Sequence, residues 1–385
     1  IHLEITEKCN ASCPMCARNI FGGPVNPNID NSELSLADIM KILPPVVLQQ
    51  IRKIYACGNY GDPMVARDTL EIFQYFKKYN PFIIMGMHTN GSGRSSEWWY
   101  ELGKTFNDGC SSVKFAMDGL SDTNHLYRKN TSWDKIINSV QNYIDGGGIA
   151  VWEYLVFKHN EHQIEEAREL SKKMGFKEFN VKRSSRFHTL NRDTGNVSVW
   201  DNGFPVYDRS LNYQYSLEYP TIEDKQHPLV MDAIENGRVE TKDTTKHYAE
   251  LIKKHDHNTI KYDTSDLNRN YKSFINNSCI SCKVVREKSV YVSAQALIFP
   301  CCWTAHTIKD LFMGHHVAQI VELAREYGFE NIDARFTPIN EIIDSNWIQK
   351  VFKTLFWIAR VSAGFPRGFK RKEVQNPTKA PKDNI

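Results

Sequence analysis

Short apolar segments alternate with longer amphipathic segments between residues 2 and 183. Several of the amphipathic segments begin at Ser, Asp or Asn and end before Gly or Asn-Pro, as helices do. Strand and helix repeated in this order predict parallel strands joined by right-handed crossovers. We expect six strands, at residues 2–6, 53–57, 82–87, 113–117, 151–157 and 178–183. We expect helices near 35–50, 65–79, 95–106, 132–145 and 161–174.

Parallel strands of this kind form either an open doubly wound sheet or a partly or fully closed barrel. In both folds the functional site lies where the C-terminal ends of the strands meet their loops. The loops after the first four expected strands have unusual sequences, so the pattern places four motifs on one rim. They are CNASCPMC (9–16), GNYGDP (58–63), HTNGS (88–92) and DGLSD (118–122).

Seven of the nine cysteines fall into two groups. The odd total and the low density of cysteines argue against a disulfide framework, and the grouping indicates metal ligation in a reducing compartment. We interpret the two isolated cysteines, Cys57 and Cys110, as small buried apolar residues. The first group is Cys9, Cys13 and Cys16, and the second is Cys279, Cys282, Cys301 and Cys302.

The first cysteine group suits an iron-sulfur cluster. Three thiolates on one tight loop can hold three corners of an iron-sulfur cube, which leaves one iron open to a small chelating ligand such as the amine and carboxylate of an amino acid. A structural zinc site would recruit a fourth ligand, for which Cys57 or His88 is a candidate. The spacing of the cysteines by itself leaves both alternatives open.

The C-x3-C-x2-C spacing after the first strand resembles the signature of the radical S-adenosylmethionine enzymes. The later rim loops resemble the motifs of that family in the same order, and the likeness covers roughly residues 1–185 and 279–303. YGDP (60–63) resembles its Gly-Gly-Glu-Pro loop, HTNG (88–91) its third-strand motif, and DGLSDTNHLYR (118–128) the fourth-strand segment of the subgroup with C-terminal auxiliary clusters.

The resemblance implies an α/β fold, a partial (β/α)6 TIM-type barrel followed by a small C-terminal auxiliary-cluster domain. A reduced [4Fe-4S] cluster on Cys9, Cys13 and Cys16 would pass one electron to S-adenosylmethionine, which breaks into methionine and a 5'-deoxyadenosyl radical. The residues implied in S-adenosylmethionine binding are Met15, Tyr60, Gly61, Asp62, Pro63, Asn90, Asp118 and Arg128.

Three residues depart from the pattern of the family. Met15 stands where an aromatic residue is usual, Asp62 where Glu is commoner, and Ala116 where Ser often reaches the ribose. Met15 is still expected to pack against adenine as a soft apolar group. Arg128 is expected either to pair with the carboxylate of S-adenosylmethionine or to be a solvated surface residue. No catalytic acid or base is assigned.

The second cysteine group is a C-x2-C motif followed, after a strand-turn-strand segment, by two adjacent cysteines. Alone it suits a zinc ribbon as well as a cluster. Beside the barrel motifs it resembles the auxiliary-cluster region called SPASM or Twitch, and four cysteines suffice for one cluster, expected to be [4Fe-4S]. Because adjacent residues of an extended chain point to opposite faces, Cys301 and Cys302 can both ligate only if the chain turns near Pro300.

Four segments are expected. They are the barrel at 1–189, an irregular linker or insertion at 190–275 that faces the substrate, the auxiliary-cluster domain at 276–345, and a C-terminal helix with a basic mobile tail at 346–385.

Net charge and hydropathy restrict the partners. A formal charge of +3 supports no general attraction to nucleic acid or to an acidic membrane. No run of eighteen apolar residues and no leader-like segment is present, so we expect no membrane partner and a cytoplasmic location. An electron donor such as flavodoxin or ferredoxin is implied by the resemblance.

The function expected from this reading is an oxidoreductase-type radical enzyme that dehydrogenates, cross-links or epimerises a peptide or protein side chain. The same chemistry on a small carbohydrate-like or nucleotide metabolite is the alternative. Two other classes remain open, a two-site zinc protein that binds nucleic acid through the basic tail and a cluster-bearing electron carrier without S-adenosylmethionine chemistry.

Overall fold

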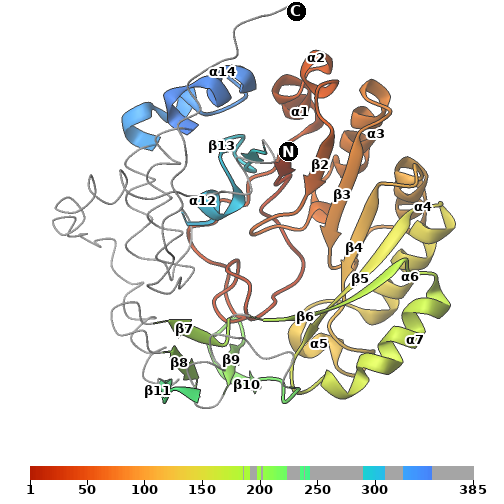
Figure 1. Ribbon diagram of the computed structural model, residues 1–385, viewed down its shortest axis with the longest axis vertical. Coiled ribbons are helices and arrows are strands. Elements are labelled where there is room, and N and C mark those ends of the chain that lie inside the picture. The colour runs from red at the N-terminus through yellow and green to blue at the C-terminus, as the bar shows by residue number, and fades with distance from the viewer. Residues whose placement is uncertain are drawn as a thin grey trace, which may run out of the picture.

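A computed structural model gives the fold of the chain (Figure 1). Cys279 and Cys282 lie outside the described residues, and so do the expected C-terminal helix and tail (346–385) from residue 349 onward. The described residues are 1–184, 186–190, 197–200, 203–222, 235–237, 239–242, 289–307 and 324–348.

A parallel sheet forms the centre of the fold, as the strand-helix alternation predicts. Its strands β1 to β6 are neighbours in chain order, and their register pairs His2 with Tyr55 and His88 with Lys114. The sheet curves around the loop that follows β1, consistent with a partial TIM-type barrel (Figure 1). The strands are β1 (His2–Leu3), β2 (Lys53–Ala56), β3 (Ile84–Thr89), β4 (Ser112–Ala116), β5 (Ile149–Val156) and β6 (Glu178–Arg183).

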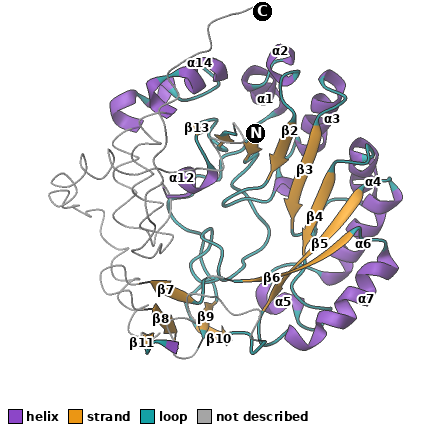
Figure 2. Cartoon of the chain, viewed as in Figure 1, coloured by secondary structure: helices purple, strands orange, loops and turns teal. Residues whose placement is uncertain are grey.

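Helices cover the outer side of this sheet (Figure 2). Ser35, Ser95 and Ser132 cap helices with their side chains, as the sequence predicts. The helix expected at 35–50 is two helices, because Pro44 disfavours helical backbone at Leu43 and has no N–H to continue the ladder. The helices are α1 (Leu36–Ile42), α2 (Pro45–Leu48), η1 (Pro63–Val65), α3 (Thr69–Tyr79), α4 (Ser96–Phe106), α5 (Asn124–Tyr127), α6 (Trp133–Asp145), η2 (Glu161–Gln163) and α7 (Ile164–Met174).

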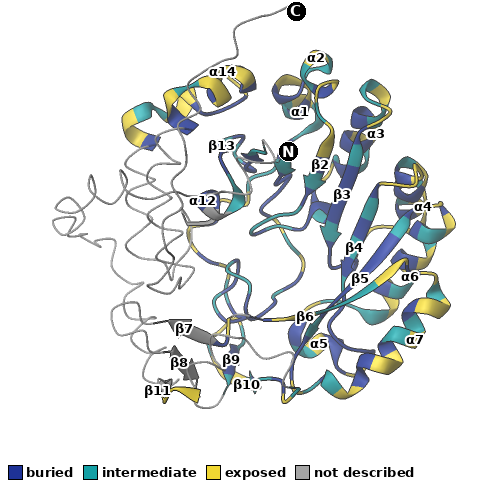
Figure 3. Cartoon of the chain, in the orientation of Figure 1, coloured by how far each residue is buried: buried dark blue, intermediate teal, exposed yellow. Residues whose placement is uncertain are grey.

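The main apolar core lies between the sheet and these helices, where the strands are largely buried (Figure 3). Large aromatic side chains fill it, among them Trp99 of α4, Tyr143 of α6 and Phe115 of β4. The ring centroids of Trp99 and Phe115 are 5.4 Å apart, and those of Phe115 and Tyr143 are 5.8 Å apart. This packing fixes the outer side of the sheet, so the loops at the strand ends stand on a rigid base.

Short strands occupy the described parts of the segment expected to be irregular. Two of them pair as an antiparallel hairpin, and three others form a small separate sheet. Alternation in YQYSL (213–217) is consistent with one of these strands. They are β7 (His188–Leu190), β8 (Val197–Trp200), β9 (Phe204–Tyr207), β10 (Tyr213–Leu217) and β11 (Val239–Lys242).

The C-terminal hairpin extends the main sheet. Strand β12 (Tyr291–Val292) runs parallel to β1 and antiparallel to β13 (Ile298–Phe299). The turn between them has Ala296 in the left-handed conformation, with φ of 64°. None of the described helices has the length and hydropathy needed to cross a membrane. The remaining described helices are α12 (Cys302–Thr307), η4 (Phe329–Asn331) and α14 (Ile339–Asp344).

Candidate functional site

The loop after β1 carries Cys9, Cys13 and Cys16 into the concave side of the sheet. Backbone N–H groups shape it, because Cys16 N donates to Cys13 O at 3.0 Å and Ala11 N donates to Cys9 Sγ at 3.4 Å. Cys13 is buried in a second apolar cluster with Phe21, and the rings of Phe21 and Phe204 of β9 lie 5.5 Å apart. Apolar side chains therefore shield Cys13 from water, and Cys9 and Cys16 pack against the same cluster while partly exposed.

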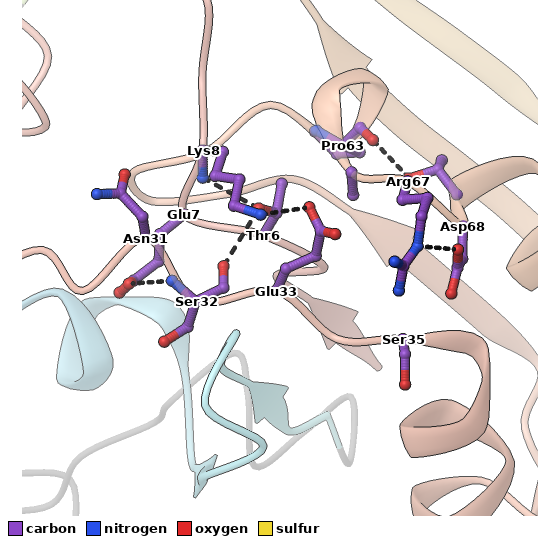
Figure 4. Close-up of polar contacts among 12 residues, drawn as sticks. Thr6, Glu7, Lys8, Asn31, Ser32, Glu33, Ser35, Pro63, Arg67 and Asp68 are labelled. Carbon is purple, nitrogen blue, oxygen red and sulfur yellow. Dashed lines mark hydrogen bonds and ion pairs between the residues drawn. The ribbon is translucent and has the colours of Figure 1, made fainter.

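Polar contacts fix the start of this loop (Figure 4). Thr6 Oγ1 donates to Ser32 O at 3.2 Å, and Lys8 Nζ lies 3.3 Å from Glu33 Oε2. Ser32 N in turn donates to Glu7 Oε2 at 3.2 Å. These contacts link the start of the cysteine loop to the segment that precedes α1 and so fix its conformation.

Burial makes two of these thiols, those of Cys9 and Cys13, hard to ionise without a metal. It raises the pKa of Cys13 to about 11 against the opposing effect of Arg128. It raises the pKa of Cys9 well above its ordinary value, and Asp62, Cys13 and Cys16 raise it further. Cys9 and Cys13 therefore need a positively charged group close to them to become thiolates.

The donor chemistry suits an iron-sulfur cluster. Within the described ranges, no three His, Cys, Asp or Glu side chains are grouped closely enough to hold one metal ion. Cys9, Cys13 and Cys16 belong to one loop, pack in the same apolar cluster and lie within electrostatic reach of one another, so they can supply three corners of an iron-sulfur cube. The residues present therefore fit a multi-iron group at Cys9, Cys13 and Cys16.

Arg128 lies between a buried carboxylate and the cysteine loop. Its Nε donates to Asp118 Oδ2 at 2.6 Å, and its Nη1 lies 3.6 Å from Cys13 Sγ. Asp118 is fully buried and also accepts from Leu155 N at 2.6 Å. The Arg128 side chain is 19% exposed, so the expected alternative of a solvated surface arginine is wrong.

Asp62 and Asn90 join two rim loops. Asp62 Oδ2 accepts from both the backbone N and Nδ2 of Asn90 at 2.7 Å, and Oδ1 accepts from Met64 N at 3.0 Å. Asn90 Nδ2 also donates to Asn10 Oδ1 at 2.9 Å and lies 3.9 Å from Cys9 Sγ. Both side chains are buried, so their hydrogen bonds set the positions of three loops.

Gly61 is held against the start of the cysteine loop. A Cβ on Gly61 would stand 1.8 Å from Thr6 O, so only glycine permits this approach. Tyr60 N donates to Glu4 Oε1 at 2.8 Å, and Tyr291 OH donates to Glu4 Oε2. Burial raises the pKa of Glu4 to about 7. The sequence reasoning missed Glu4, although a carboxylate within the first apolar strand segment was a signal for it.

Residues 3–171 match the family model of the radical SAM superfamily. Residues 3–171 are thus similar to a radical SAM superfamily domain, and we call this segment the radical SAM domain. The matched residues include the cysteine loop, the Asp62–Asn90 contact and the Asp118–Arg128 pair. No curated protein matches the sequence.

Solved structures of low sequence identity also resemble the chain. SuiB of Streptococcus suis bound to S-adenosylmethionine is 14% identical with a TM-score of 0.44, and the match covers 78% of this chain. The chain spans 59% of the length of SuiB. Native anSMEcpe with bound AdoMet and Cp18Cys peptide is 13% identical with a TM-score of 0.44, covering 94% of this chain and 96% of that one. BtrN in complex with AdoMet and 2-DOIA is 10% identical with a TM-score of 0.32, covering 94% and 86%.

Two further residues implied in S-adenosylmethionine binding lie at the rim of the radical SAM domain. Met15 is buried, and Ser184 Oγ donates to its Sδ at 3.2 Å. Pro63 begins η1, and its carbonyl accepts from Thr69 Oγ1 at 2.5 Å. Met15 thus contacts the end of β6, and Pro63 anchors the loop after β2.

The described half of the second cysteine group adjoins the radical SAM domain. The chain turns after β13, and α12 begins at Cys302, so the two adjacent cysteines do not lie in an extended segment. Cys301 Sγ lies 3.2 Å from Thr304 Oγ1. Asn59 Nδ2 donates to Cys302 O at 2.9 Å, which links this group to the loop after β2.

The two isolated cysteines differ from expectation. Cys110 is exposed, so the prediction that it is buried is wrong. It lies in a turn before β4 where Asp108 Oδ1 accepts from Cys110 N at 2.8 Å, and this turn leaves its side chain outside the core. Cys57 is half-buried, with its Sγ 3.7 Å from His88 Nδ1.

Proposed function

We propose that this chain is an enzyme that reductively cleaves S-adenosylmethionine and uses the resulting 5'-deoxyadenosyl radical to abstract hydrogen from a substrate carbon. The observation that carries the proposal is the shielded cysteine loop of the radical SAM domain, with Arg128 placed between Asp118 and Cys13. A [4Fe-4S] cluster held by Cys9, Cys13 and Cys16 supplies, when bound, the electron that breaks the sulfonium bond.

The side chains around the loop have separate tasks in this proposal. Arg128 places a positive charge beside the thiolates, and Asp118 holds the guanidinium in place. Asp62 and Asn90 fix the loops after β2 and β3, so that Tyr60, Gly61 and Pro63 present backbone groups to the methionyl end of S-adenosylmethionine. Met15 meets the adenine as an apolar surface.

We infer that the substrate is a peptide or protein side chain and that the reaction is of the oxidoreductase type, with a small carbohydrate-like or nucleotide metabolite as the alternative substrate. An auxiliary [4Fe-4S] cluster on Cys279, Cys282, Cys301 and Cys302 would take up the electron left after hydrogen abstraction. The hydrogen bond from Asn59 to the Cys302 carbonyl supports a position for this cluster beside the rim.

The test is the release of 5'-deoxyadenosine by protein purified without oxygen, reduced with dithionite and mixed with S-adenosylmethionine. We expect slow release without substrate and none from the Cys13→Ala variant. The Cys110→Ala variant, which removes an exposed cysteine outside the loop, serves as the matched control and should behave as the unmodified chain. Zinc without iron and sulfide in the unmodified protein, or absence of 5'-deoxyadenosine, would refute the proposal.

A further inference from the structure

Three charged side chains from neighbouring strands form an ionic cluster at the inner face of the sheet. The Nζ atom of Lys114 on β4 lies 3.5 Å from the Oε1 atom of Glu153 on β5. Lys182 of β6 pairs through its Nζ with Glu153 Oε2. Asn180 Nδ2 donates to Glu153 Oε1 at 3.4 Å. We call Lys114, Glu153 and Lys182 the lysine cluster.

The lysine cluster lies on the face of the sheet that carries the cysteine loop. Side chains two residues apart on a strand share a face, so Lys182 shares one with Ser184, which donates to the sulfur of Met15. Lys182 is also within electrostatic reach of Asp118 and Cys57. The lysine cluster therefore lies beside the proposed S-adenosylmethionine site.

Two ammonium groups in this cluster share one carboxylate. Glu153 compensates one positive charge. Two further carboxylates lie nearby: Asp118 is paired with Arg128, and Glu178 accepts from Asn180 Nδ2 at 3.2 Å. His88, the neighbour of Lys114 on β3, is neutral and adds no positive charge, because burial and then Lys114 lower its pKa to about 3. Burial and the charge of Lys114 likewise lower the pKa of Lys182. Lys114, Glu153 and Lys182 together therefore carry a net charge of +1, and Glu153 is the carboxylate that both ammonium groups contact.

The exposure of the three side chains shows where an anion can approach. Glu153 is 9% exposed, whereas Lys114 and Lys182 are 34% and 49% exposed. The carboxylate therefore lies beneath the ammonium groups. At the edge strand β6, Lys182 and Asn180 also border an open groove of about 640 Å³, which is lined as well by Glu165 and Arg168 of α7.

We propose that Lys114 and Lys182 bind an anionic group of the substrate, a carboxylate or a phosphate, in competition with the carboxylate of Glu153. Lysine acts as a point charge and suits both kinds of oxyanion. That the anion belongs to the substrate rests on the proposed function. The inference narrows the substrate to molecules with a negative group close to the carbon that loses hydrogen.

Isothermal titration calorimetry on the full chain, with its iron-sulfur content restored and S-adenosylmethionine absent, tests the site. The probes are glutarate for a carboxylate and inorganic phosphate for a phosphate, titrated in separate arms. We expect one of them to bind, and Lys182→Met and Lys114→Met each to weaken its binding by about tenfold, the loss of one charge-assisted hydrogen bond. Lys135→Met removes an exposed lysine of α6 and should change the affinity by less than about twofold.

Two further variants separate a binding role from a structural one. Glu153→Gln removes the competing carboxylate, so anion affinity should rise, by roughly threefold to tenfold. Lys182→Arg keeps the charge and should retain binding. Equal affinities in the unmodified chain and both methionine variants, or weaker binding in Glu153→Gln, would overturn the proposal.

S-adenosylmethionine also carries a carboxylate, which the two lysines could bind in place of a substrate anion. A separate titration with S-adenosylmethionine distinguishes the two alternatives. We expect its affinity to be alike in the unmodified chain, Lys114→Met and Lys182→Met. A tenfold loss in either variant would assign the lysines to the cofactor and overturn the substrate assignment. If the protein binds the anion through these lysines but releases no 5'-deoxyadenosine, the proposed function is refuted and the anion site is still supported.

Discussion

Arg128 Nη1 lies 3.6 Å from Cys13 Sγ while Arg128 Nε donates to the buried Asp118 at 2.6 Å. The carboxylate is held in turn by Leu155 N, so the guanidinium is fixed between β5 and the cysteine loop. A fixed positive charge beside a sulfur ligand favours the more negative, reduced state of a cluster bound there.

Arg128→Met should therefore shift the midpoint potential of the barrel cluster to a more negative value, on the order of 50–100 mV for a charge removed at this range. Spectroscopic redox titration measures the shift. Arg67→Met, which removes an exposed arginine outside the site, should leave the potential unchanged. A potential unaltered in Arg128→Met would contradict this role of the arginine.

Asp62→Ala should reduce stability more than cofactor affinity. The carboxylate accepts three hydrogen bonds from buried groups of Asn90 and Met64, and leaving these donors unpaired should cost roughly 2–4 kcal/mol. The loss of S-adenosylmethionine affinity should be modest, since the loop acts through its backbone. Urea unfolding and cofactor titration measure the two effects.

Asn90→Ala provides the double-mutant comparison for this pair. The variant that lacks both side chains should be destabilised by less than the sum of the two single variants, because they share hydrogen bonds. Strict additivity would show that the two side chains act independently. Complete loss of cofactor binding in a folded Asp62→Ala variant would refute the backbone role.

Glu4 should make stability fall as the pH rises. Burial raises its pKa from 4.5 to about 7, so the folded chain keeps a proton that the unfolded chain releases between these values. The free energy that protonated Glu4 contributes to stability is fully present below its pKa in the unfolded chain. It is lost as the pH rises through its pKa in the folded chain, with a slope of at most about 1.4 kcal/mol per pH unit.

Glu4→Gln cannot ionise and should remove this slope. Urea unfolding should be measured from about pH 5.5 to pH 8.5. The free energy of unfolding of Glu4→Gln, relative to that of the unmodified chain, should increase up to about pH 7 and stay constant above that pH. Glu97→Gln, an exposed carboxylate of α4, is the matched control. A constant difference between the two chains over the whole range would contradict the buried-carboxylate account.

Iron analysis should count two clusters. The reconstituted chain should hold about eight irons, and the variant with Cys9, Cys13 and Cys16 replaced by Ala should keep about four, bound by the second cysteine group. Cys301→Ala or Cys302→Ala should lower the iron content while uncoupled cleavage of S-adenosylmethionine persists. No iron in the triple variant would refute the auxiliary cluster.

The order and type of the helices and strands in the barrel could be predicted because hydrophobic periodicity and helix-capping residues are local properties of the sequence. The rim position of the cysteine loop follows from the parallel topology alone. The break at Pro44 and the exposure of Cys110 were missed although local signals existed, since Pro44 interrupts the apolar period and Asp108 begins a turn.

The partners of the charged side chains could not be predicted in the same way. Lys114, Glu153 and Lys182 meet through the register of three strands, which no single strand specifies. The Asp62–Asn90 contact likewise depends on the packing of two loops. Charged residues within otherwise apolar strands were the signal that such partners exist.

The open iron at Cys9, Cys13 and Cys16 is the central claim, and electron-nuclear double resonance on the reduced protein tests it most directly. The sample contains S-adenosylmethionine labelled with ¹⁵N at the methionyl amine. We predict a ¹⁵N coupling to the cluster in the unmodified chain, because the amine binds the iron that lacks a cysteine. A reduced cluster that shows no such coupling in a sample saturated with the cofactor would contradict the claim.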